Sequence, residues 1–137
     1  MSRSTLIVSL LMISACTHQP VPAQDPAKAW VELFTRTGKL VMAEQLDGVR
    51  LSDGRYFQLA PGGHDLMVRF DYDVTQPLLP MGQPIERICY ITLRYQSFQA
   101  GQRYRLEARS LGLSTLAMLY DPQGVKVATA RDVNCLF

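Results

Sequence analysis

The stretch HDLMVRFDYDV, residues 64–74, places apolar side chains at every second position. One face carries Leu66, Val68, Phe70, Tyr72 and Val74, and the other carries Asp65, Met67, Arg69, Asp71 and Asp73. A period of two, with β-branched and aromatic residues on one side, is typical of a strand that buries a single face. This stretch therefore predicts a half-buried β-strand.

The same alternation recurs nearer the C-terminus. In ICYITLRYQSF, residues 88–98, the apolar face carries Cys89, Ile91, Leu93 and Tyr95. In RYRLEARSL, residues 103–111, it carries Tyr104, Leu106 and Ala108. Two further apolar stretches, 113–121 and 125–130, flank the sequence DPQG at 121–124. Pro at the second position and Gly at the fourth are typical of a β-turn, so a hairpin is expected there.

Turn signals occur at similar intervals earlier in the chain. The stretches 40–46, 49–52 and 55–59 are separated by Asp47-Gly48 and Asp53-Gly54, and Asp-Gly is a strong signal for a short hairpin. Residues 26–34 fit either a strand or one helical turn, and a strand is preferred. About 7–8 short strands at this spacing predict an all-β fold, either a small antiparallel β-sandwich or a flattened barrel.

Length and charge limit the possible functions. The chain has 137 residues, which suits one domain, and its formal net charge is +2. This charge is small and the sequence has no block of Lys or Arg. Nucleic acid is therefore not expected as a partner.

The first residues have the order of a secretory signal peptide. Arg3 supplies a positive charge, residues 6–13 are almost all apolar, and the small residues Ser14-Ala15 precede Cys16. The apolar stretch is much shorter than the ~20 residues that a membrane-spanning helix needs. Residues 1–15 are therefore predicted to be a signal peptide that the mature protein lacks.

The sequence Ile13-Ser14-Ala15-Cys16 resembles the lipobox of bacterial lipoproteins. The resemblance implies that the Cys16 sulfur receives a diacylglyceryl group and that Cys16 becomes the first mature residue. Two or three acyl chains give a nearly permanent anchor, at about 0.8 kcal/mol per buried CH₂. The alternative is an ordinary signal peptide with a chance cysteine at its cleavage site.

Residues 16–27 are rich in proline and predict an extended tether that leads to a domain at 28–137. Thr17, rather than Asp, follows Cys16. By resemblance to enteric-type lipoproteins, this residue implies the cell outer membrane, with the protein lipid-anchored on the periplasmic side.

Lipidation of Cys16 leaves Cys89 and Cys135 as a pair in an oxidising compartment. A disulfide is the expected outcome, and closure of so long a loop is worth about 4 kcal/mol in the chain-entropy model. A redox or metal-binding pair is the alternative, although the sequence contains no Cys-x-x-Cys.

The stretch LDGVRLSDGRYFQLAPGGHDLMVRF, residues 46–70, resembles PEGA-like and related β-domains of the bacterial envelope. These domains have an Asp-Gly turn followed by an L-x-P-G-x-H-x-L-x-V-x-F run. With Gly63 taken as an insertion, the residues that match this run are Leu59, Pro61, Gly62, His64, Leu66, Val68 and Phe70. Residues 60–63 differ from the tetrad that names PEGA. The stretch 98–109 is also similar to small lipoproteins of Gram-negative bacteria, including uncharacterised ones from pseudomonads. The resemblance implies an anchored β-sandwich that contacts envelope partners or surfaces.

The sequence predicts no catalytic site. His64 is the only His of the predicted domain and follows a Pro-Gly-Gly turn, where it is expected to cap a backbone carbonyl. Asp71 and Asp73 share one strand face at a spacing that suits acid–base work on a glycan, but a solvated face neutralised by Arg69 is the simpler interpretation. The chain is therefore expected to be no enzyme, with no catalytic residue, no cofactor and no metal site.

Arginines gather on the outward side of the predicted strands. Arg94, Arg103, Arg105 and Arg109, together with Arg87, are expected to form a basic patch on adjacent strands. Such a patch suits an anionic glycan or an envelope protein, because Arg pairs well with phosphate and carboxylate. The alternative is that these arginines pair across strands with Asp71, Asp73 and Glu107.

Two functions remain open. The first is a non-enzymatic envelope lipoprotein that is held in membrane lipid through Cys16 and binds or scaffolds a protein or envelope-surface partner. The second is a periplasmic inhibitor of a cell-wall hydrolase, similar to lysozyme inhibitors. In SDGRY, residues 52–56, Ser52 and Tyr56 match the Ser-Gly-x-x-Tyr signature of one such family only in part.

Overall fold

The computed structural model describes residues 16–75 and 82–136, so the predicted signal peptide lies outside the described residues. The described residues form nine strands and no helix, and therefore no helix with the length and apolarity to cross a bilayer. The strands are β1 (Ala29–Phe34), β2 (Leu40–Leu46), β3 (Val49–Arg50), β4 (Tyr56–Leu59), β5 (Gly62–Val74), β6 (Ile85–Phe98), β7 (Arg103–Leu111), β8 (Ser114–Tyr120) and β9 (Lys126–Leu136).

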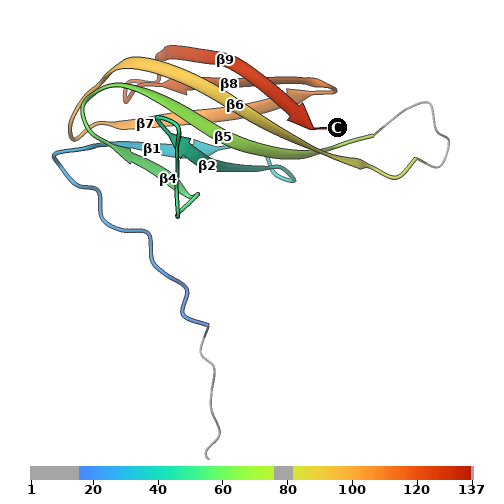
Figure 1. Cartoon of the computed structure of the whole chain (residues 1–137), viewed down its shortest axis with the longest axis horizontal. Helices are drawn as coiled ribbons and strands as arrows, with labels where there is room; N and C mark the ends of the chain where they lie inside the picture. The colour runs from blue at the N-terminus through green and yellow to red at the C-terminus, as the bar shows by residue number, and fades with distance from the viewer. Residues whose placement is uncertain (1–15, 76–81, 137) are drawn as a thin grey trace, which may run out of the picture.

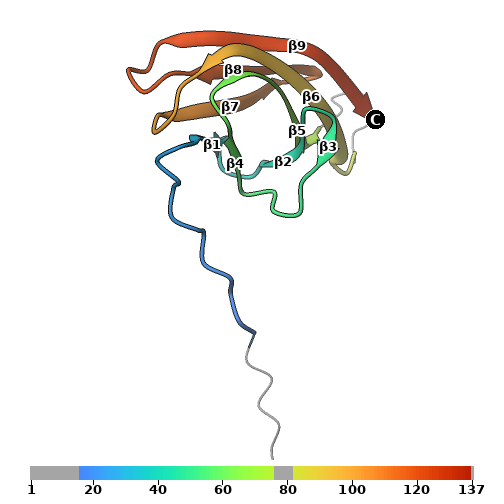
Figure 2. The ribbon, with the colours of Figure 1, turned by 60° about the vertical axis from the view of Figure 1, so that its left-hand side comes forward.

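All nine strands join one sheet in the order β3-β2-β5-β6-β9-β8-β7-β1-β4. The pairs are antiparallel except for β1 and β7, which run parallel. The sheet curls into a half-barrel, as Figures 1 and 2 show, and the connection between its end strands β3 and β4 is held to β2, where the Ala43 amide donates to the Gly54 carbonyl at 2.8 Å. The all-β prediction is confirmed, with nine strands in a single curled sheet where about 7–8 were expected.

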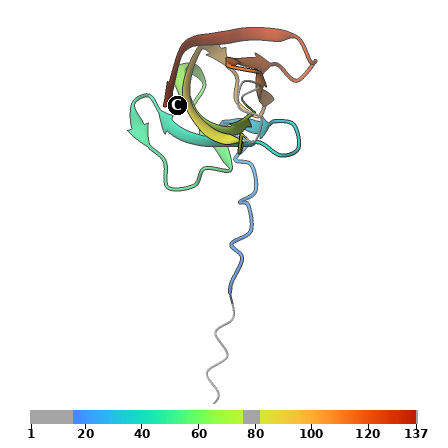
Figure 3. The same cartoon turned by 90° about the vertical axis from the view of Figure 1, so that its right-hand side faces the viewer.

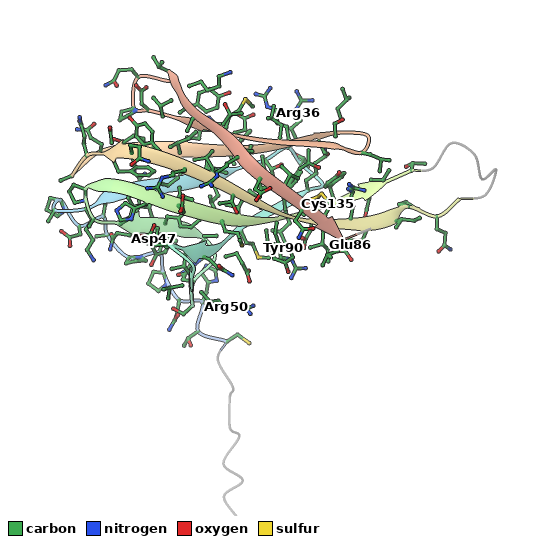
Figure 4. The ribbon with its side chains drawn as sticks, turned by 45° about the horizontal axis from the view of Figure 1, so that its top comes forward. Arg36, Asp47, Arg50, Glu86, Tyr90 and Cys135 are labelled. Carbon is green, nitrogen blue, oxygen red and sulfur yellow. A yellow bond between two sulfur atoms is a disulfide. The ribbon has the colours of Figure 1, made fainter. Side chains whose placement is uncertain are left out.

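Strand β9 links the two halves of the sheet because its two ends have different partners. Thr129 lies opposite Met118 of β8, whereas Cys135 lies opposite Cys89 of β6. The two opposed cysteines form a disulfide between positions 46 residues apart. The predicted disulfide is therefore confirmed, and Figure 4 labels Cys135 close to the end of β9.

The core lies inside the curl of the sheet. The apolar faces predicted for β5, β6 and β7 are the buried ones, and Leu66, Phe70, Ile91, Leu93 and Leu106 are 0% exposed. Ala29 and Val31 of β1 join the same cluster, which confirms a strand within 26–34. Burial of these side chains supplies the main driving force for folding.

Two of the three predicted hairpins are present. Strands β2 and β3 join through Asp47 and Gly48, whose φ values of 51° and 80° lie in the left-handed region that such a short turn requires. Strands β8 and β9 join through 121–124, where Asp121 Oδ1 accepts hydrogen bonds from the Gln123 and Val125 amides at 2.9 and 2.8 Å. Local turn chemistry therefore determines both connections.

The hairpin predicted at Asp53-Gly54 is wrong. Strand β3 pairs with β2, and β4 pairs with β1 at the other end of the sheet, so the chain crosses between the two ends at this point. A Cβ atom on Gly54 would lie 3.2 Å from the Ala43 carbonyl oxygen and 3.3 Å from Met42 Cβ. Gly54 therefore permits the close approach of the β3–β4 connection to β2, which a larger residue would crowd.

Candidate functional site

The arginines predicted as one basic patch lie on two separate parts of the sheet. Arg87 and Arg94 belong to β6, whereas Arg103, Arg105 and Arg109 belong to β7. Strands β9 and β8 lie between β6 and β7, so the prediction of one patch on adjacent strands is wrong. Although β6 and β7 are consecutive in sequence, the disulfide-linked β9 occupies the place beside β6.

Two of these arginines are held in ion pairs. Arg94 binds Asp65 of the neighbouring strand β5 at 2.9 Å, and Arg109 donates from Nε to Glu107 Oε1 at 2.6 Å. Glu107 is buried, and its hydrogen bond and charge raise the pKa of Arg109 above the ordinary value. The predicted pairing with Glu107 is thus present for Arg109, although it runs along one strand instead of across two.

Arg103 and Arg105 lie over aromatic rings instead. The Arg105 guanidinium carbon is 3.8 Å from the centroid of the Phe34 ring, and that of Arg103 is 5.4 Å from the Trp30 ring. Trp30 in turn stacks on Tyr56, with ring centroids 4.3 Å apart. Neither arginine forms an ion pair with another described residue. Contact with a ring face holds a guanidinium in place and leaves N–H groups at its edge able to donate.

An open groove of about 560 Å³ follows this outer face of β1, β7 and β8. Three arginines and three carboxylates line it, namely Arg103, Arg105, Arg109, Glu32, Glu107 and Asp121. The formal charges balance, so the groove is less basic than the predicted patch. An arrangement with both signs of charge suits a protein surface better than a uniformly anionic glycan.

The acidic side chains of β5 are also engaged. Arg69 donates from Nε and Nη2 to the carboxylate of Asp71 at 2.9 and 2.8 Å, and Asp71 is only 8% exposed. The predicted neutralisation by Arg69 is confirmed for Asp71, while Asp73 lies opposite Glu86 of β6. A carboxylate bound at two points by a guanidinium is poorly suited to proton transfer.

His64 joins three segments at the end of the sheet where β5 begins. Its Nδ1 lies 2.6 Å from Asp47 Oδ2, and its Nε2 lies 2.7 Å from the Ala60 carbonyl oxygen. Asp47 also accepts a hydrogen bond from the Asp65 amide at 2.8 Å. The contact with Ala60 is the predicted capping role of His64, whereas the part played by Asp47 was not predicted. Because both partners of the ring are acceptors, the ring donates to both only when each nitrogen carries a proton.

The surroundings of Asp47 predict a pH-dependent contribution to stability. Partial burial raises the pKa of Asp47, but hydrogen bonds from His64 and Asp65 outweigh it and hold the pKa below the ordinary value. A carboxylate with a lowered folded-state pKa stabilises the fold above its unfolded-state pKa of about 3.9, and this contribution is lost as the pH falls through the folded-state pKa.

We therefore expect Asp47→Asn to lower the free energy of unfolding near neutral pH and to approach the wild type in strong acid. Asn keeps an oxygen for the Asp65 amide and tolerates the φ of 51° at this position, so the change removes the charge together with the oxygen that contacts His64. Urea unfolding at a series of pH values measures the difference. A difference that stays constant across the series would contradict this account.

The segment before β1 is fixed to the domain. Gln24 Nε2 donates to the Gln102 carbonyl at 3.4 Å, and the Asp25 amide donates to Gln58 Oε1 of β4 at 3.2 Å. Figure 1 shows the extended segment leaving the domain near the start of β1, and the thiol of Cys16 is exposed and free. The stretch between Cys16 and the first of these docked residues spans at most roughly 27 Å when fully extended.

A second surface feature was not predicted from the sequence. The turn between β7 and β8 exposes Leu111 by 85% and Leu113 by 65%, and Leu116 of β8 is 42% exposed. These three residues are named the leucine tip. A pocket of about 420 Å³ adjoins it, and its lining includes Leu111, Leu116, Arg36, Lys39 and Arg109. The signal in the sequence is Leu-Gly-Leu at 111–113, because turns normally carry polar residues.

Among the residues in 16–75 and 82–136, no three His, Cys, Asp or Glu side chains are grouped so that they could hold a metal ion. Two surfaces combine a hollow with charged or exposed apolar side chains, namely the groove over β1, β7 and β8 and the leucine tip with its pocket. Comparison of the chain with protein-family models, with curated proteins and with solved structures finds no match.

Proposed function

We propose that this chain is a small outer-membrane lipoprotein of the Gram-negative, pseudomonad-like kind, with a PEGA-like β-domain. It is anchored in membrane lipid through acylated Cys16, faces the periplasm, and binds or scaffolds a partner without catalysing a reaction. The observation that carries the proposal is the division of the three cysteines. Cys89 and Cys135 are joined within the domain, while Cys16 is an exposed thiol on an extended segment directly after Ser14-Ala15.

The way the tether docks supports the same function. Hydrogen bonds from Gln24 and Asp25 to the domain, and from Arg55 to the Gln19 carbonyl, hold the tether along most of its length. An anchored domain is then held within roughly 27 Å of the membrane surface. A lipoprotein of this kind suits a partner that is itself part of the envelope.

The groove over β1, β7 and β8 supports a protein partner in preference to an anionic glycan. Arg103 and Arg105 are held over Trp30 and Phe34 and have donor groups to spare. Carboxylates in the same groove disfavour a ligand of uniform negative charge. Arginines and aromatic residues are also the residue types most often enriched where proteins bind one another.

Cys16→Ala is expected to release the protein from the outer-membrane fraction or to mislocalise it, because the acyl chains supply the anchor. Membrane fractionation and the intact mass of the purified protein measure the change. Thr17→Ala is the matched control, since it leaves the cysteine in place and should fractionate with the membrane. Unchanged fractionation and unchanged mass for Cys16→Ala would refute the anchor.

Inhibition of a cell-wall hydrolase is the alternative function, and the structure gives it less support. Arg55 binds Asp53 at 2.7 Å and donates to the Gln19 carbonyl at 2.8 Å. The segment with Ser52 and Tyr56, on which this alternative rests, is therefore held against the tether. An inhibitory loop needs to project into the cleft of an enzyme.

A further inference from the structure

The leucine tip exposes more apolar surface than a turn of this size needs. Leu111 and Leu113 flank Gly112, which forms the turn with a φ of 57°. Leaving a leucine exposed forgoes the favourable free energy of its burial. Single exposed leucines are common on protein surfaces, but a group of three beside a pocket is typical of an interaction site.

The pocket beside the tip is lined by cationic, apolar and hydroxyl-bearing residues, and none of its lining residues is acidic. Lys39 Nζ donates to Ser110 Oγ at 2.6 Å and lies 5.7 Å from the Tyr72 ring, so its position is fixed. Arg109 is already bound to Glu107. The Arg36 side chain is exposed, and Figure 4 labels it at the surface. Arg36 forms no ion pair with any residue in the described part of the chain.

We propose that the leucine tip and its pocket bind an acidic segment of a partner protein. In this arrangement an apolar side chain of the segment packs against Leu111 and Leu116. Carboxylates next to it bind the Arg36 guanidinium and the remaining ammonium N–H of Lys39. The complementarity of charge identifies the partner, because the pocket offers cations and an apolar wall but no negative group.

We infer that the tip binds a protein and not the membrane surface. This step rests on the proposed function, because it assumes the anchor at Cys16. Strands β1 and β7 run parallel from the end where the tether docks toward the tip. The strand from Arg103 to Leu111 spans roughly 26 Å at the usual rise per residue. Figure 3 views the domain from the end that carries the tip, which is opposite to the end where the tether docks. The tip therefore lies at the opposite end of the strands from Gln24 and Asp25, the residues through which the tether docks.

The test uses the full chain in detergent micelles and a displayed library of random short peptides. We expect the wild type to select a class of peptides that combines Asp or Glu with a large apolar residue. Leu113→Asp and Arg36→Glu should each weaken the binding of this class at least about tenfold. Val49→Asp and Arg50→Glu are control variants on β3 and should bind as the wild type does, since Val49 is 69% exposed and the β2–β3 turn lies where β5 begins, at the opposite end of the strands from the tip.

Three results would overturn the inference. The first is the absence of an acidic class of peptides, or a class whose binding is unaffected by Leu113→Asp and Arg36→Glu. The second concerns proteoliposomes that contain lipid-borne quenchers, with a dye attached at Leu113→Cys or at Val49→Cys. If the dye at position 113 is quenched more strongly than the dye at position 49, the membrane is the occupant. The third is a dimer in sedimentation that Leu113→Asp dissociates, which would make a second copy the occupant. Peptide binding and sedimentation do not depend on acylation, so failure of the anchor at Cys16 would leave the first and third results unchanged.

Discussion

Removal of the disulfide is expected to lower the free energy of unfolding by about 4 kcal/mol, because the bond restricts the unfolded chain over a long loop. Cys89 and Cys135 are 46 residues apart in sequence and lie opposite each other on β6 and β9. Small domains are stable by only about 5–15 kcal/mol, so this loss is a large part of the total. It also frees β9, the strand that links the two halves of the sheet.

The double variant Cys89→Ala, Cys135→Ala is the appropriate test, since either single change leaves an unpaired thiol. Cys89 is fully buried, and alanine avoids placing a polar group in the core. Equilibrium unfolding in urea gives the free energy for the wild type and the variant, and wild type unfolded in the presence of a reductant is the control. An unchanged midpoint in the double variant would mean that the bond contributes no stability.

The parts of the fold that were predicted from sequence are those that short stretches determine. The buried faces of β5, β6 and β7 follow from alternation, because a slip of one residue would turn every apolar side chain outward. The turns at Asp47-Gly48 and at 121–124 follow from residues that favour their backbone angles. In both cases the sequence and the structure agree because no distant segment is involved.

The wrong predictions concern which strands are neighbours. Asp53-Gly54 has the chemistry of a hairpin, yet β4 lies beside β1 at the opposite end of the sheet from β3. Arg94 and Arg103 are close in sequence, yet two strands separate β6 from β7. The disulfide already carried part of this information, since a bond between two strands at Cys89 and Cys135 places β9 against β6.

The candidate surfaces could be predicted only in part, because they too depend on which residues are neighbours in space. The arginines of β7 were found from their spacing, but the partner of each depends on the fold: Glu107 for Arg109 and aromatic rings for Arg103 and Arg105. The hydrogen bond between Asp47 and His64 joins residues from two hairpins, and no local sequence pattern specifies it. The charge of a surface therefore has to be judged from its neighbours in space.

Phe57→Ala is expected to cost about 3–5 kcal/mol of unfolding free energy, which is large for a residue on an edge strand. Phe57 is 0% exposed although β4 is the last strand of the sheet and pairs only with β1. The curl of the sheet explains this burial, because it brings β4 over the core and toward β2. In an open, flat sheet an edge phenylalanine would lose much less on truncation.

Phe34→Ala is the matched control, since it makes the same chemical change at a side chain that is 40% exposed over Arg105. Its expected cost is about 1 kcal/mol or less, as for most surface substitutions. Urea unfolding followed by the fluorescence of Trp30, the single tryptophan, suits both variants because this ring stacks on Tyr56 of β4. If Phe57→Ala costs only about 1 kcal/mol or less, as expected for Phe34→Ala, β4 is not part of the core and the sheet ends at β1. The close approach of Gly54 to β2 would then be unnecessary, and the hairpin expected at Asp53-Gly54 would again be the better account of this segment.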